Sequence, residues 1–226
     1  MRAATAEAVQ PNTELETALW HRGMQRVVGL DEVGRGCLAG PVVAAACVLP
    51  PGFVPSLPMR DSKQLSRAQR ELLASVILEH AVAVAVGAAS HREVDRLNVR
   101  RATVLAMQRA LRRLGDWDHA LYDGLPMPEL PPPRFTAVVN GDERCLSIAC
   151  AAIVAKVTRD RLMARLASRF PAYGWERNAG YGTAEHLTAL ETHGLSPFHR
   201  RTFAPVRLCL VGNDHWETCS DQDLDR

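Results

Sequence analysis

The sequence predicts an α/β fold in which helices flank a mixed five-stranded sheet, with a helical C-terminal extension. Three apolar runs of strand length come early in the chain, and two further short apolar runs alternate with helical patterns. The chain has 226 residues, 47% of them apolar and 23% charged, which is typical of a globular protein with a substantial core.

The first half of the chain supplies three strands and two helices. We expect a short helix over Glu14–Arg22, strands over Arg26–Asp31 and Val42–Leu49, a helix over Arg67–His80 and a strand over Ala81–Ala89. Ser66 is the expected N-cap of the second helix, whose apolar residues recur on one side. The third strand is continuously apolar, as is typical of a strand covered on both faces.

The second half alternates helices with two short strands. We expect a helical turn over His91–Arg96, a helix from Asn98 to Leu114, strands over His119–Gly124 and Phe135–Asp142, and helices over Glu143–Phe170 and Ala184–His193. The long helix begins almost entirely with small and apolar residues, which allows close packing against the sheet. No internal repeat or linker divides the chain, so a single fold is expected.

Four acidic residues are expected near the ends of strands. Asp31 and Glu32 end the first strand, Asp123 ends the fourth, and Asp142 follows the fifth. Adjacent side chains point to opposite faces of a regular strand, but at its end both can turn toward one cation. Clustered carboxylates favour Mg²⁺ or Mn²⁺, and a pair of such ions is the usual apparatus for phosphodiester hydrolysis.

Each acidic residue also has a structural interpretation. Asp31 and Glu32 could be polar residues of a hairpin, and Asp123-Gly124 is a common turn dipeptide. Asp142 is placed to be only the N-cap of the helix that follows. Spacing alone leaves these alternatives open.

Several contiguous motifs stand out over roughly residues 26–207. In chain order they are DEVGRG (31–36), DSKQLS (61–66), LNVRRATVLAMQRAL (97–111), YDG (122–124), AKVTRD (155–160), GYGT (180–183) and HRRTFAPV (199–206). With these motifs the chain resembles bacterial ribonuclease HII, a member of the ribonuclease H-like superfamily.

The resemblance implies a ribonuclease H-like fold and an endoribonuclease. Such an enzyme hydrolyses the RNA strand of RNA–DNA hybrids, nicks DNA duplexes on the 5′ side of embedded ribonucleotides, and leaves 5′-phosphate and 3′-hydroxyl ends. It further implies roles in ribonucleotide excision repair and DNA replication. Residues 25–210 would then be the catalytic domain, preceded by a polar lead (1–24) and followed by an acidic tail (211–226).

The resemblance also assigns site residues. The metal-binding and catalytic set is Asp31, Glu32, Asp123 and Asp142, with Mn²⁺ or Mg²⁺, two ions during catalysis. The substrate-binding set is Gly34, Arg35, Gly36, Lys63, Asn98, Lys156, Arg159 and Tyr181. The Gly34-Arg35-Gly36 backbone would contact the 2′-hydroxyl that distinguishes RNA from DNA, and Tyr181 would pack on the adjoining deoxyribose.

Some of these residues have a second interpretation. Asn98 could be only an N-cap, and Tyr181 could be a core aromatic residue. Lys156 and Arg159 would contact phosphates or support the site. His199, Arg200 and Arg201 could face phosphates or be structural.

The chain departs from the family pattern at four positions. Asn140 stands where a lysine is common, Ala149 and Ala152 replace frequent serines, and Gly182 replaces a frequent proline. None of these removes a catalytic group, so we expect an active enzyme with a weaker preference for RNA–DNA junctions.

Three other functions are alternatives to ribonuclease HII. Ribonuclease HIII would carry a sizeable N-terminal domain, whereas only about 25 residues precede the first strand here. A resolvase-like nuclease would share clustered acids but not DEVGRG. A hybrid-binding protein without catalysis would not need all four acids.

Charge and cysteine usage refine these expectations. From Lys156 to Arg207 there are nine Lys/Arg against four acidic residues, which predicts a basic face for a polyanion or merely a solvated helix face. The six cysteines show no metal-binding spacing, and no apolar segment resembles a signal peptide or membrane span. We expect a cytoplasmic monomer; no motif identifies a protein partner.

Overall fold

The computed structural model describes residues 10–54 and 65–211. The expected helices and strands are present, and their bounds are α1 Glu14–Trp20, β1 Val27–Val33, β2 Val42–Val48, α2 Arg67–His80, β3 Ala83–Ala89, α3 His91–Leu97, α4 Val99–Leu114, β4 His119–Asp123, β5 Phe135–Val138, α5 Gly141–Arg144, α6 Leu146–Arg169, a 3₁₀ turn Pro171–Tyr173, α7 Trp175–Asn178, α8 Ala184–His193 and α9 Ala204–Val211. The short helices α7 and α9 were not expected.

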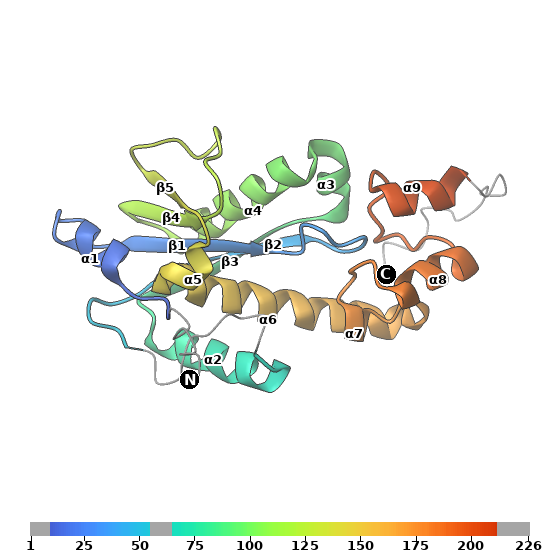
Figure 1. The fold of residues 1–226 in the computed structure, drawn as a ribbon, viewed down its shortest axis with the longest axis horizontal. Coiled ribbons are helices and arrows are strands. Elements are labelled where there is room, and N and C mark those ends of the chain that lie inside the picture. Colours follow the sequence, from blue (N-terminus) through green and yellow to red (C-terminus); the bar gives the residue numbers. More distant parts are fainter. Residues whose placement is uncertain (1–9, 55–64, 212–226) are drawn as a thin grey trace, which may run out of the picture.

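The five strands form one mixed sheet in the order β3-β2-β1-β4-β5. The β1–β2 and β2–β3 pairs are antiparallel, whereas β4 runs parallel to β1 and to β5. α3 and α4 cover one face, and α6 lies on the other with α2 outside it (Figure 1). The predicted fold class is therefore confirmed.

β3 differs from its expected environment. It is an edge strand, and most of its residues are half-buried. The strand with every residue buried is β2, because it lies between β1 and β3 with helices on both faces. Continuous apolarity therefore did not distinguish the edge strand β3 from the fully buried strand β2, since both runs consist mainly of alanine and valine.

The structure corrects the segment around Asp142. β5 ends at Val138, and Asn140 adopts the left-handed conformation with φ 54°. The expected single helix is divided into α5 and α6 by Cys145, whose backbone is extended. Asp142 lies within the first turn of α5, so it is not the N-cap of the long helix.

The predicted boundary after residue 24 does not separate two packing units. Leu19 of α1 is buried together with Val27 of β1, Leu121 of β4 and Ile148 of α6. The segment from residue 10 onward is therefore part of the same fold.

The C-terminal helices form a separate small core at one end of α6 (Figure 1). Its centre is Trp175, which is fully buried beside Tyr173, His186 and His199. The expected helical extension is thus present. None of the helices within the described ranges is long and apolar enough to cross a membrane.

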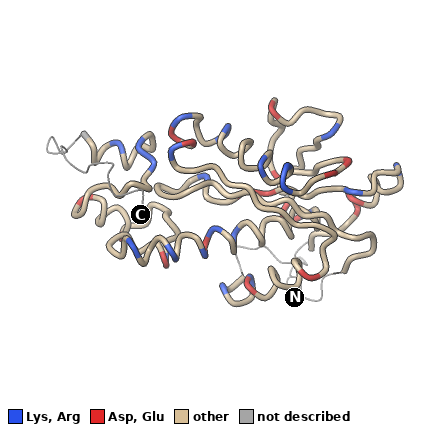
Figure 2. The backbone as a smooth tube through the Cα atoms, turned by 180° about the vertical axis from the view of Figure 1, so that it is seen from behind, with Lys and Arg blue, Asp and Glu red and all other residues tan. Residues whose placement is uncertain are grey.

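The predicted basic face is smaller than the count along the sequence suggests. Arg159 and Arg200 are fully buried, while Lys156, Arg161 and Arg177 form ion pairs with acidic neighbours. Figure 2 shows acidic residues interspersed with the Lys and Arg residues of this region. A count along the sequence overestimated the basic surface because it could not identify buried or paired cations.

Candidate active site

The acidic pair Asp31 and Glu32 lies within β1, just before the end at which it was expected. The strand continues to Val33, and the two residues pair with Ala45 and Ala44 of β2. Asp31 is only 8% exposed, and its Oδ1 accepts a hydrogen bond of 2.7 Å from the Glu32 amide. Glu32 forms an ion pair of 3.0 Å with Arg35.

Asp123 and Asp142 reach the same end of the sheet from two other elements. Asp123 is the last residue of β4, which runs parallel to β1, and Asp142 follows β5 in α5. The Gly141 amide donates a hydrogen bond of 2.6 Å to Asp123 Oδ1, which joins the two elements. The expected convergence of strand ends is confirmed.

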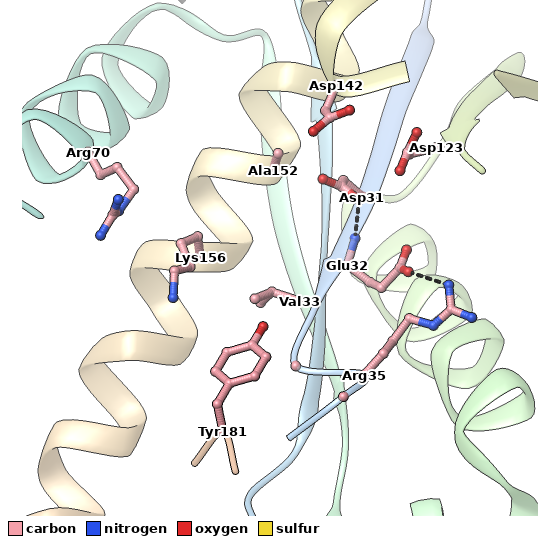
Figure 3. Close-up of a pocket in the computed structure, with 12 residues that line it drawn as sticks. Asp31, Glu32, Val33, Arg35, Arg70, Asp123, Asp142, Ala152, Lys156 and Tyr181 are labelled. Carbon is pink, nitrogen blue, oxygen red and sulfur yellow. Dashed lines mark hydrogen bonds and ion pairs between the residues drawn. The ribbon is translucent and has the colours of Figure 1, made fainter. Parts of the chain in front are cut away.

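The four carboxylates line one pocket with a volume of about 480 Å³. Figure 3 shows Asp31, Asp123 and Asp142 grouped on one side, with Lys156 and Arg70 across the pocket on α6 and α2. The full lining set is Asp31, Glu32, Val33, Gly34, Arg35, Gly36, Arg70, Asp123, Asp142, Ala152, Lys156 and Tyr181.

Burial is the main cause that raises the pKa of the two central carboxyls, Asp31 and Glu32. Burial raises the pKa of Asp31 well above its usual range, and the charges of Glu32, Asp123 and Asp142 raise it further. Burial also raises the pKa of Glu32, although the ion pair with Arg35 opposes this effect. A cation among these carboxylates would relieve both the repulsion and the cost of burying charge.

The chemistry of these donors fits a hard divalent cation. All four offer carboxylate oxygens, the ligands that Mg²⁺ and Mn²⁺ prefer. Within the described residues, however, no three His, Cys, Asp or Glu side chains are arranged closely enough to hold a metal ion. In the described residues the four carboxylates thus line the pocket without forming a ready-made coordination sphere.

The Gly34-Arg35-Gly36 loop forms the rim of the pocket. Gly34 has a φ of 92°, and a Cβ there would lie 2.2 Å from Nε of Arg159 beneath it. At Gly36 a Cβ would meet nothing within 4 Å. One glycine is therefore required by the packing below the loop, whereas the other keeps the backbone open to a ligand.

Tyr181 lies beside this loop and is not a core residue. Its side chain is 40% exposed and lines the pocket. The preceding residue, Gly180, accepts a hydrogen bond of 2.8 Å from the Leu38 amide, just beyond the glycine loop. The ring is therefore presented to the pocket by a turn that is tied to the loop.

Among the other predicted contacts that the structure describes, only Lys156 lines the pocket, and it pairs with Asp160 at 2.7 Å. Asn98 does not line the pocket; its Oδ1 accepts a hydrogen bond from the Arg101 amide and caps α4. The N-cap interpretation is therefore the one that the structure supports. Lys63 lies outside the described residues.

Arg159 was placed in the substrate-binding set, but its position contradicts a phosphate contact. Its guanidinium is fully buried and donates hydrogen bonds to the carbonyls of Ala39, Pro41 and Ala179 at 2.7–3.1 Å. A guanidinium with these partners cannot reach solvent. The residue supports the glycine loop from below, which was the second interpretation of its role.

The segment His199-Arg200-Arg201 is likewise not a phosphate-facing patch. Arg200 is buried and donates to the carbonyls of Gly40 and Arg35, and His199 is buried against His186. Only Arg201 has an exposed side chain. The structural interpretation therefore holds for the first two residues.

The sequence did not single out Arg70 or Val33 as pocket residues. Arg70 lies in the first turn of α2, and its guanidinium donates to the Leu65 carbonyl. Its position four residues after the end of the DSKQLS motif was the available signal. Of the departures from the family pattern, Ala152 lines the pocket, whereas Ala149 belongs to the core between α6 and the sheet.

Known proteins are similar to this chain over most of its length. The sequence profile of the family described as ribonuclease HII matches residues 28–206. The ribonuclease HII of Thermosynechococcus vestitus is 57% identical over 188 residues, which cover 83% of this chain and 88% of that protein.

Solved structures show the same fold. The ribonuclease H2 of Pyrococcus horikoshii superposes with a TM-score of 0.68 at 25% identity, covering 81% of this chain and 96% of that one. Bst-RNase HIII in complex with Mn²⁺ gives a TM-score of 0.66 at 18% identity, covering 83% of this chain and 70% of that one. At that identity the second likeness supports the fold alone.

Proposed function

The chain belongs to the ribonuclease HII family, and on that premise we propose that it hydrolyses the RNA strand of RNA–DNA hybrids and nicks DNA duplexes on the 5′ side of embedded ribonucleotides. The observation that carries the proposal is the pocket in which four carboxylates, an open glycine loop and an exposed tyrosine lie together. We further propose 5′-phosphate and 3′-hydroxyl products.

Asp31, Glu32, Asp123 and Asp142 would hold Mg²⁺ or Mn²⁺. Two bound ions would neutralise the scissile phosphate and activate the attacking water. The raised pKa of Asp31 supports this assignment, because buried carboxylates that repel one another are stabilised by a cation. Lys156 and Arg70, on the opposite wall, would bind phosphates flanking the cut.

The Gly34-Arg35-Gly36 loop would supply the discrimination between RNA and DNA. Its open backbone at Gly36 allows close approach to a 2′-hydroxyl. Tyr181, on the same side of the pocket, would pack against the neighbouring deoxyribose and favour a junction. A role for a cytoplasmic enzyme in the excision repair of ribonucleotides embedded in DNA would follow from this specificity.

The decisive experiment uses a DNA duplex that contains one ribonucleotide, incubated with Mn²⁺ or Mg²⁺ and analysed on a denaturing gel. We expect a single nick 5′ to the ribonucleotide. Cleavage only of a uniform hybrid would contradict the junction specificity. Cleavage of neither substrate by folded protein would favour a hybrid-binding protein without catalysis.

Asp123→Asn tests whether Asp123 is a metal ligand. The amide oxygen can still accept the Gly141 hydrogen bond, so α5 should stay in place while a charged ligand is lost. We expect turnover to fall about a hundredfold or more while hybrid affinity is kept. Turnover within a few-fold of wild type would show that Asp123 is not a metal ligand.

A further inference from the structure

We propose that Glu16 is a positioning residue, whose buried carboxylate holds the junction between α5 and α6 and thereby places Asp142 at the pocket. The inference rests on the proposed function, because it concerns a carboxylate to which that function assigns a metal ion. It also gives the N-terminal segment a role in the site.

Glu16 is buried in an unusual way for a charged residue. Glu16 is only 1% exposed, although it belongs to the short helix α1 and does not line the pocket. Oε1 accepts hydrogen bonds from the Ser147 amide at 2.7 Å and from the Cys145 thiol at 3.1 Å. Oε2 is buried with no hydrogen-bond partner among the described residues. A buried carboxylate with an unsatisfied oxygen is costly, so a specific role is required to explain it.

The groups that Glu16 binds lie at the start of α6. The first amides of a helix have no partner within it, and the N-cap Cys145 makes no side-chain capping bond. Glu16 supplies this missing cap from another element, and its negative charge suits a helix N-terminus. The neighbouring Asn12 adds two backbone hydrogen bonds, from its amide to the Arg144 carbonyl at 3.2 Å and from the Leu146 amide to its carbonyl at 2.8 Å.

This junction determines where Asp142 lies. α5 has only four residues, so it has too few internal hydrogen bonds to hold itself in place. At its start, the Gly141 amide is bound to Asp123; at its end, Arg144 and Cys145 are bound to Asn12 and Glu16. Asp142 projects from this short helix toward Asp31 and Asp123 (Figure 3). Loss of the second anchor would free one end of α5.

The same junction touches the strand that carries Asp31. A Cβ at Gly29 would lie 2.1 Å from the Ser147 carbonyl carbon, so the backbones of β1 and α6 are in direct contact there. Ser147, whose amide Glu16 binds, therefore packs against Gly29, which lies two residues before Asp31 in β1. Both central carboxylates depend on its placement.

The test compares Glu16→Ala with Glu14→Ala, an exposed glutamate on the same helix. Mn²⁺ binding to the full-length protein is measured by calorimetry, and hybrid binding is measured separately without divalent metal. We expect Glu16→Ala to weaken Mn²⁺ binding about tenfold, as is typical when a residue supporting a metal ligand is removed. Hybrid affinity should stay within twofold of wild type, and Glu14→Ala should match wild type in both.

Val104→Ala is the control that distinguishes a general loss of stability from a specific loss of Mn²⁺ binding. Val104 is buried on α4, which contributes no residue to the pocket. This variant should lower the melting temperature without changing Mn²⁺ affinity. If Glu16→Ala does not fold, Glu16→Gln keeps the volume and one acceptor oxygen, and it should weaken Mn²⁺ binding about threefold.

Unchanged Mn²⁺ affinity in the folded Glu16 variant would overturn the positioning role, as would an equal loss in Val104→Ala. Neither result would affect the proposed function, which fails only if wild-type protein cleaves no substrate that contains ribonucleotides. A tenfold weaker affinity in Glu16→Ala alone supports the inference.

Discussion

Asp31 and Glu32 are neighbours on a regular strand, and yet both line one pocket. Asp31 is buried among carboxylates, whereas Glu32 is paired with Arg35 at the rim. The two residues therefore have different electrostatic surroundings despite their adjacency. Asp31 bears the higher cost of ionisation, so it has the most to gain from a bound cation.

Tyr181 provides a prediction at the residue scale. Tyr181→Ala should reduce cleavage at a single embedded ribonucleotide more than cleavage of a uniform hybrid, because the exposed ring is expected to pack on a deoxyribose. By analogy with stacking on bases, the difference should be about 1–3 kcal/mol. The ratio of kcat/KM on the two substrates measures it. Tyr181→Phe keeps the ring and should behave as wild type; equal losses on both substrates would exclude the proposed role.

At the scale of elements, the contact between β1 and α6 determines the geometry of the site. Gly29→Ala would place a methyl group 2.1 Å from the backbone carbon of Ser147, so the helix and the strand would have to separate. We expect a loss of about 3 kcal/mol in the free energy of unfolding, measured by urea denaturation. Gly36→Ala is the matched control, because nothing lies within 4 Å of its added methyl group. Similar stability of the two variants would contradict this packing argument.

The buried histidine pair of the C-terminal helices predicts a pH dependence. Burial, together with the neighbouring His186, lowers the pKa of His199 to about 3. In the unfolded chain the side chain takes up a proton near pH 6.5. Between these values the unfolded state binds more protons, so stability must fall as pH falls.

We expect His199 to account for a loss of about 2 kcal/mol in the free energy of unfolding between pH 6.5 and 5. Urea denaturation of wild type and His199→Gln across this range tests the prediction. The variant is less stable at pH 7 because it disrupts the contact with His186, but its stability should fall less steeply toward pH 5. Parallel pH profiles would show that His199 does not titrate as expected.

At the scale of the whole molecule, two buried arginines join the sheet to the C-terminal helices. Arg159 binds carbonyls on both sides of this boundary, Ala39 and Pro41 after β1 and Ala179 after α7. Arg200 binds the carbonyls of Arg35 and Gly40 from the C-terminal side. Arg159 thus links the segment before Tyr181 to the chain after the glycine loop, and Arg200 holds the loop itself at Arg35.

Arg159→Gln tests this structural role against a phosphate contact. It should lower the free energy of unfolding by about 3 kcal/mol, because buried carbonyls lose charged donors. The salt dependence of hybrid binding should not change. Lys156→Gln, which removes a cation that lines the pocket, should reduce the log–log salt slope by about one. A reduced salt slope in Arg159→Gln would show that Arg159 does contact a phosphate of the hybrid.

The sequence by itself determined the family, the order of strands and helices along the chain, and the four carboxylates at one end of the sheet. These features depend on local periodicity and on motifs that are contiguous in the chain. Parallel neighbouring strands bring their ends to the same edge, so the convergence of Asp31, Asp123 and Asp142 could be inferred without coordinates.

Only the tertiary structure decided which polar residues face the pocket and which are buried beneath it. Arg159 and Lys156 lie three residues apart on α6, but one binds backbone carbonyls in the core and the other lines the pocket. Glu16 appeared to belong to a polar lead, but it is buried against residues about 130 positions away. The environment of a side chain depends on contacts between segments that are distant in the sequence, and these contacts cannot be inferred from a local sequence pattern.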